Sequence, residues 1–274
     1  MKLLSVLLVT GVLLAPNLLL ADDEWRDWPL GDRLNLSIGG YFPDLDSEAT
    51  VSEVDGLQGT PINFEDDLGL DDSDTAIFAA LNWRFFKRHA LNLNYYNLDR
   101  DAVATTSDVI VFDGIVFPAG IETDTEFNIN VYELSYSYSL LFDAKKNLYL
   151  GFGVSAQDLE FGIASTQIPA LSADEDFIAP LPTLNVGFEY ALSDKWLLGL
   201  KLGYMDIDVD FGDDSFDAKI LIGDAGVRWK AFNNLGLSLS YSLFHLDGEY
   251  EDDDIVAELD LDYKGPKASI DFYF

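Results

Sequence analysis

Several long stretches of the chain alternate between apolar residues and small or polar residues with a period of two. The clearest examples span residues 132–142, 184–192 and 235–243. Helical spacing would scatter the apolar side chains around an axis, whereas a period of two over about ten residues predicts strands. That is also the length that a tilted strand needs to cross a bilayer. The apolar positions are Tyr132, Leu134, Tyr136, Tyr138, Leu140, Phe142, Leu184, Val186, Phe188, Tyr190, Leu192, Leu235, Leu237, Leu239, Tyr241 and Leu243.

The opposite face of these stretches consists of Ser, Gly, Asn and an occasional charged residue, such as Glu133 and Glu189. A soluble sandwich would place its polar face in water, where Lys and Thr are common. Small side chains instead suit a narrow barrel lumen, in which they interlock. The pattern therefore predicts an all-β protein, an antiparallel transmembrane β-barrel, with a soluble barrel as the alternative.

The turns indicate the topology, because short and long connections alternate along the chain. Short polar turns occur at 87–89, 143–146, 193–195 and 233–234, and longer acidic segments span 43–73, 105–124, 164–178, 206–217 and 247–254. This alternation predicts about ten strands in up-and-down order, with both chain ends on the short-turn side, which is periplasmic in such barrels. Residues 47–53 and 61–64 also have strand character, so eight and twelve strands are alternatives.

The N-terminal region has the pattern of an export signal. Lys2 precedes a mostly apolar run over residues 3–20, and Ala21 is followed by acidic residues. A basic start, an apolar middle and a small residue before a polar segment predict a secretory signal peptide over residues 1–21. The mature barrel would then span residues 22–274. The absence of cysteine excludes lipoprotein attachment and disulfides.

The last strand carries a resemblance to a known class. Its apolar residues are Ala268, Ile270, Phe272 and Phe274, which alternate with Ser269, Asp271 and Tyr273. This ending resembles the terminal strand of bacterial outer-membrane proteins of the small up-and-down, porin-like class. The resemblance implies the bacterial cell outer membrane as the location. It also implies the barrel-assembly machinery, outer-membrane lipid and lipopolysaccharide as partners. Residues 62–70 are similar to a stretch of uncharacterised outer-membrane barrels, which carries no function, and no particular family is indicated.

Composition adds a strong charge asymmetry. The chain is 14% aromatic and 49% hydrophobic, yet its net charge is −33. The aromatic content argues against a disordered acidic chain. The five long segments hold more than half of the 49 acidic residues and no Lys or Arg. Such acidity can solvate a surface, or it can bind divalent cations that bridge to anionic lipopolysaccharide. It disfavours nucleic acid as a partner.

One acidic segment has the spacing of a possible cation site. Carboxylates at i, i+2 and i+4 share one face if the strand continues, and two more follow in the same segment. An EF-hand loop is not formed, because Phe211 stands where that loop needs glycine. We therefore expect weak calcium binding at most, and no other cofactor. The candidate ligands are Asp206, Asp208, Asp210, Asp213 and Asp214.

The predicted lumen contains side chains of both charges. Opposite charges in a narrow barrel can pair across the interior, and leaving them unpaired would be costly. We expect a filled interior, with a narrow cation-preferring pathway as the alternative. The predicted lumen residues are Arg84, Asn92, Asn94, Glu133, Glu189, Lys201, Asp224, Arg228 and Asp271. The predicted membrane girdles contain Trp83, Phe85, Tyr132, Tyr138, Trp196, Tyr204 and Trp229.

Catalysis finds little support. Ten strands resemble the omptin proteases, whose motif is Asp-x-His near the outer rim, whereas this chain has His245-Leu-Asp247. His89 lies in a predicted inner turn. We therefore expect no enzyme. The expected role is structural or in surface interactions, the alternative is a small cation-preferring porin-like channel, and a rim-located enzyme ranks third.

Overall fold

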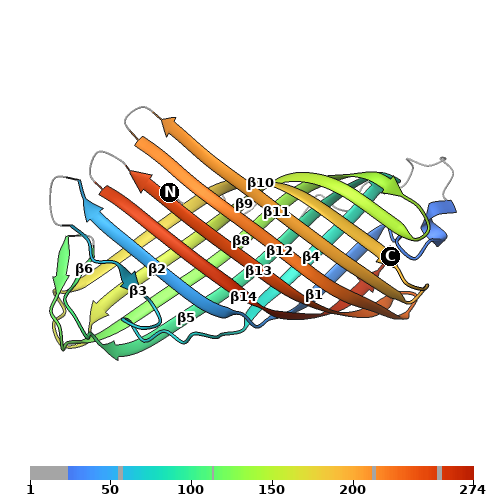
Figure 1. Ribbon diagram of the computed structural model, residues 1–274. Helices are drawn as coiled ribbons and strands as arrows, with labels where there is room; N and C mark the ends of the chain where they lie inside the picture. Colours follow the sequence, from blue (N-terminus) through green and yellow to red (C-terminus); the bar gives the residue numbers. More distant parts are fainter. Residues whose placement is uncertain (1–23, 55–57, 113, 212–213, 252–254) are drawn as a thin grey trace, which may run out of the picture.

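A single antiparallel sheet closes on itself to form a barrel (Figure 1). The computed structural model describes residues 24–274 apart from 55–57, 113, 212–213 and 252–254, so the predicted signal peptide lies outside the described residues. No helix in the described part is long and apolar enough to span a membrane. The elements are η1 (Glu24–Asp27), β1 (Leu34–Tyr41), β2 (Asp44–Glu53), β3 (Ile62–Asn63), β4 (Ala76–Phe86), β5 (His89–Thr105), β6 (Ile110–Phe112), β7 (Ile115–Phe117), β8 (Glu122–Phe142), β9 (Lys146–Ser165), β10 (Ser172–Ala191), β11 (Trp196–Phe211), β12 (Asp214–Phe232), β13 (Leu235–Glu251) and β14 (Ile255–Tyr273).

The ring contains ten strands, as predicted. Its order is β1-β4-β5-β8-β9-β10-β11-β12-β13-β14, and β14 pairs back onto β1, with Asn35 opposite Tyr273. Every pairing in the ring is antiparallel, which is the up-and-down arrangement. The start of β1 and the end of β14 lie together, because the Phe274 carbonyl oxygen accepts from the amides of Arg33 and Leu34.

The first wall strand consists of two parts. β1 ends at Tyr41, and β2 continues along the same neighbour β14, with Asp44 opposite Lys264. Phe42 and Pro43 form the break between them, which fits the preference of proline for strand irregularities. Gly265 permits this break, since a Cβ there would lie 2.1 Å from the Phe42 carbonyl oxygen. β2 therefore adds length to the wall and no eleventh ring position.

The predicted hairpin at 47–53 and 61–64 is present but lies outside the ring. β3 pairs with β2 alone, with Glu48 opposite Asn63. β4 pairs with β5 only as far as Asn97, and the later residues of β5 pair with β8. β2 and β5 therefore do not pair directly in this part of the wall. Residues 62–73, which we call the gap segment, contact both strands there: the amide of Phe64 donates to Ser47 of β2, and Arg100 of β5 donates to Asp71.

The short turns match the predicted ones, whereas the long segments differ from the prediction. Strands cover much of the acidic sequence expected in loops: β11 continues to Phe211, β12 begins at Asp214, and β8 already begins at Glu122. The prediction of long outer loops was therefore wrong in extent. The reason is that acidic residues alternate with apolar ones in these segments. This alternation allows a strand with one face toward water and the other toward an apolar interior.

The outward face of the barrel carries a band of exposed apolar side chains about nine residues tall. On β11 it runs from Trp196 to Tyr204, with Leu200 at its centre. Of the predicted girdle aromatics, Tyr138 and Phe85 are half-buried. The others are exposed, namely Trp83, Tyr132, Trp196, Tyr204 and Trp229. Apolar strands of this height with aromatic borders match the lipid-facing surface of an outer-membrane barrel.

Beyond the band, the polarity of the wall is reversed. On β8 the outward residues are apolar from Tyr132 to Leu140, whereas Glu122, Asp124 and Glu126 face outward further along. The inward residues change in the opposite sense, from Glu133 to a run of buried apolar side chains. We call the banded part the membrane-level wall. The rest is the outer extension, formed by residues 44–53, 97–105, 122–130, 156–165, 172–182, 205–211, 214–220, 245–251 and 255–263.

Candidate functional site

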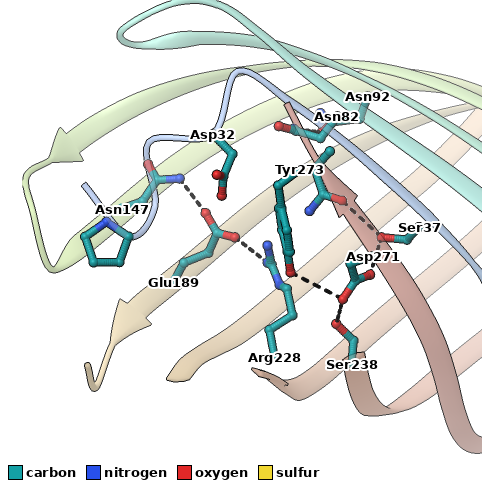
Figure 2. A network of polar contacts seen from close by, with 12 residues as sticks. Asp32, Ser37, Asn82, Asn92, Asn147, Glu189, Arg228, Ser238, Asp271 and Tyr273 are labelled. Atoms are coloured by element: carbon teal, nitrogen blue, oxygen red, sulfur yellow. Dashed lines mark hydrogen bonds and ion pairs between the residues drawn. The ribbon is translucent and has the colours of Figure 1, made fainter. Parts of the chain in front are cut away.

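The interior of the membrane-level wall holds a network of polar side chains near the inner end (Figure 2). Arg228 of β12 donates to Glu189 of β10 at 2.6 Å, and the Asn147 amide donates to the same carboxylate at 2.8 Å. These residues occupy inward positions because the side chains of a strand alternate between its faces. A carboxylate that accepts from a guanidinium and an amide is held ionised and oriented.

A second carboxylate, Asp271 of β14, is almost fully buried in the same network. Its oxygens accept from Ser37 at 2.6 Å and from Ser238 (Figure 2). They also accept from Ser269 at 3.1 Å. The Tyr273 hydroxyl donates to it at 3.4 Å. Burial of a charge is costly unless hydrogen bonds compensate. The small serines of three strands provide this compensation.

Two more ion pairs cross the lumen closer to the outer extension. Lys201 lies 3.2 Å from Glu133, and Lys267 lies 2.8 Å from Asp224. Asn94 also donates to Glu133, at 2.9 Å. All nine residues predicted to face the lumen line a single cavity of about 400 Å³. The prediction missed Lys267, although it stands on the same inward face of β14 as Asp271.

The inner end of the cavity is covered by the segment before β1. Trp25 and Trp28 pack on Phe142, with ring centroids 6.1 and 5.4 Å apart. Lys230 donates to the Pro29 carbonyl oxygen at 2.7 Å and pairs with Asp32. Sequence reasoning did not identify this cover, because Phe142 lies far along the chain from Trp25 and Trp28.

The interior of the outer extension is apolar. Phe64 of the gap segment stacks on Phe161 at 5.1 Å and meets Phe127 edge-on at 4.9 Å. Ile62 and Leu68 of the same segment are almost fully buried in this cluster. The gap segment therefore occupies the opening between β2 and β5 and packs against the interior behind it.

One ion pair is embedded in this apolar interior. Arg100 of β5 lies 2.5 Å from Glu65 of the gap segment, and the two side chains are only 2% and 11% exposed. The guanidinium also donates to Ser47 at 3.1 Å and to the Asp71 carbonyl oxygen at 2.7 Å. Sequence reasoning missed Arg100, although it continues the inward series of β5 that begins with Asn92 and Asn94.

Of the five predicted metal ligands, the structure describes the side chains of Asp206 and Asp208. Asp206 and Asp208 face outward on β11, and the Tyr204 hydroxyl donates to Asp206 at 3.0 Å. Asp210 and Asp214 belong to β11 and β12, and Asp213 lies outside the described residues. Within the described part of the chain, no group of three or more His, Asp or Glu side chains could hold a metal ion. Calcium binding stays a prediction.

The two histidines lie on different strands, His89 on β5 and His245 on β13. His245 faces outward on β13, and its Nδ1 lies 3.8 Å from Asp260 of β14, while Asp247 stands opposite Asp260 in the register. The contact that the structure gives His245 is therefore with Asp260 on the adjacent strand. His89 Nδ1 is 2.6 Å from the Tyr136 hydroxyl.

The closed ring, its apolar outer band and its polar, paired lumen define a bacterial outer-membrane β-barrel. Comparison with solved structures supports this class. The chain is similar to the outer-membrane protease OmpT of Escherichia coli, with a TM-score of 0.51, 10% identity, and coverage of 88% of this chain and 97% of that chain.

Two further similarities are weaker. The outer-membrane protein OprG of Pseudomonas aeruginosa gives a TM-score of 0.42 at 14% identity, covering 89% of this chain and 97% of that chain. Ail, the attachment invasion locus protein of Yersinia pestis, gives 0.31 at 9% identity, covering 86% and 99%. No family model and no curated protein matches the sequence. The similarities therefore concern the fold.

Proposed function

We propose that the protein is a non-conducting outer-membrane barrel that presents an acidic surface outside the cell. The observation that supports this proposal is the change of polarity along the wall. Ion pairs cross the interior at membrane level and apolar side chains pack above them, while the outward face of the outer extension is acidic. An acidic outward face is suited to contacts with other surfaces, and an interior of paired charges and apolar side chains disfavours the passage of ions.

The alternative function is a small cation-preferring channel. It is favoured by the 400 Å³ polar cavity, whose lining includes the carboxylates Glu133, Asp224 and Asp271. Against it, Lys201 and Lys267 already neutralise two of these groups. An ion would also have to cross the layer around Phe64 and Phe161, where it would lose its hydration without compensation.

Conductance of the refolded protein in a planar bilayer tests the proposal. We expect no stable conductance steps. The protein inserted in the same membranes is quantified, so that silence cannot result from a lack of insertion. Steps that are cation-selective would overturn the proposal and establish the channel. Replacing Lys201 with Gln is an informative comparison, because a channel lined by Glu133 would then become more cation-selective.

The acidic surface is also proposed to attract divalent cations weakly, and through them the anionic headgroups of lipopolysaccharide. Hard cations prefer several oxygen ligands, and carboxylates face outward on neighbouring strands of the outer extension. Calorimetry with millimolar calcium tests this part. We expect a small, salt-sensitive heat that decreases in the Asp206→Asn, Asp208→Asn variant, and an absence of heat would refute cation binding while leaving the conductance result intact.

A further inference from the structure

The apolar interior of the outer extension contains a second cavity of about 200 Å³. Its wall comes from β2, β8, β9, β10, β12, β13 and β14, and the gap segment and β6 contribute to it as well. Most of the side chains that line it are apolar. They include Val51, Phe64, Phe127, Leu159, Leu181 and Leu246.

This outer cavity is separate from the polar lumen cavity below it. On β14, Leu259 lines the outer cavity, whereas the next inward residue, Leu261, lines the polar one. The same boundary falls between Leu246 and Phe244 on β13. On both strands, consecutive inward residues therefore line different cavities.

The aromatic rings around the cavity are held by one another. Phe161 stacks on Phe64 and lies 4.8 Å from Phe112, so three rings from different segments form one continuous surface. Protein interiors contain few voids larger than a water molecule. An apolar cavity of about 150 Å³ stays dry and binds a molecule such as benzene. A mostly apolar void of this size is therefore suited to a hydrocarbon.

The charged residues at the cavity restrict the kind of ligand further. Those that line it are acidic, and Glu249 and Glu258 stand opposite each other in the register of β13 and β14. A carboxylate or phosphate approaching this edge would meet negative charge and would lose its hydration inside. Anionic amphiphiles are therefore disfavoured relative to uncharged molecules of the same shape.

We propose that the outer cavity binds one small uncharged hydrocarbon group, of the size of a single aromatic ring or a short alkyl chain. This binding is a function beyond surface presentation, and it does not depend on whether the lumen conducts ions. The ligand would bind in the part of the barrel that projects beyond the lipid-facing band.

Methyl-resolved NMR of the full mature barrel in lipid nanodiscs, with benzene as the probe, tests the proposal. We expect saturable shifts of the Leu159, Leu181 and Leu246 methyl signals. Benzene dissolved in the lipid would instead shift the lipid-facing methyls of Leu200 and Leu237 in proportion to its concentration. Benzoate has the same ring with a negative charge, and we expect no saturable shift with it.

Filling the cavity provides the decisive comparison. Ala49→Leu and Ala257→Leu add side-chain volume at two lining positions, and we expect benzene affinity to fall by about tenfold or more because the site becomes overpacked. Ala164→Leu, at an outward position of β9, is the control and should leave the affinity unchanged. Unchanged binding in both filling variants, or absence of saturable shifts in the native protein, would overturn the proposal.

A further variant keeps the proposal testable if the filling variants do not fold. Leu181→Ala enlarges the cavity, so we expect it to bind naphthalene more tightly than the native protein does. Circular dichroism must show the native strand content in each variant. Naphthalene binding that is equal in native and enlarged proteins would also contradict the proposed site.

Discussion

Most strands contribute to both the membrane-level wall and the outer extension, yet the two regions have different surroundings. At membrane level lipid surrounds the wall, so apolar side chains face outward and polar side chains fill the lumen. In the outer extension the wall meets water, so carboxylates face outward and Phe127 and Phe161 face inward. The difference shows that one strand can be membrane-like in one half and soluble-like in the other.

The largest expected difference between the two regions concerns ion pairs. Glu65→Gln leaves Arg100 without an anionic partner in an apolar interior, and we expect a loss of about 3–5 kcal/mol in the free energy of unfolding. Glu133→Gln removes the partner of Lys201 in a polar lumen, and we expect a smaller loss of about 1.5–3 kcal/mol. Urea unfolding in lipid vesicles measures both, and equal losses would contradict the comparison.

Two phenylalanines on the same strand provide the next comparison. Phe161→Ala leaves a cavity inside the outer extension and should cost about 3 kcal/mol or slightly more. Phe152→Ala removes a ring that is 60% exposed toward lipid, where acyl chains replace its contacts, so we expect about 1 kcal/mol or less. The same vesicle assay measures both. A larger loss for Phe152→Ala would mean that the lipid-facing and packed positions are wrongly assigned.

A cation introduced on the outward face of β11 should lower the free energy of unfolding more at membrane level than in the outer extension. Leu200→Arg places a charge near the middle of the apolar band, and we expect a loss of about 2–4 kcal/mol. Asp208→Arg stands eight residues further along the same face, where we expect a change within about 0.5 kcal/mol. Similar losses at both positions would place Asp208 in lipid.

The smallest effect concerns pH. Partial burial, together with the carboxylates of Asp247, Asp262 and Asp46, raises the pKa of Asp260 above its ordinary value of 3.8, while His245 opposes this shift. The stabilisation from a protonated Asp260 is therefore fully present below pH 3.8 and is lost as the pH rises through the higher folded-state pKa. Stability measured across this range should rise less on acidification in Asp260→Asn than in the native protein. An equal rise in both would show that Asp260 does not contribute.

The ten-strand ring was predictable from the sequence, because the period of two and the short turns are local signals. The lumen residues followed from the same period: Glu133, Lys201 and Asp224 stand on the face opposite the apolar band. The specific pairs did not follow, because Lys201 and Glu133 come from β11 and β8, which are not neighbours in the sheet. Contacts of that kind depend on the curvature of the closed barrel.

The outer extension was misread as loops for a different reason. Its apolar residues continue the period of two but change face, and the change is marked by two adjacent apolar residues, such as Val131 and Tyr132 on β8 or Tyr204 and Met205 on β11. A strand prediction that follows apolar residues on one face alone ends at such a pair. A search for the same period in the opposite phase would have extended both strands into the acidic sequence.

Site-directed spin labelling on β8 tests the reversal of polarity most directly, and the absence of native cysteines makes single labels possible. We predict that a label at Leu134→Cys collides mainly with oxygen dissolved in lipid. A label at Glu126→Cys, on the same outward face, should collide mainly with a water-soluble nickel complex. Oxygen-dominated collisions at both positions would place the outer extension in the bilayer and contradict the account.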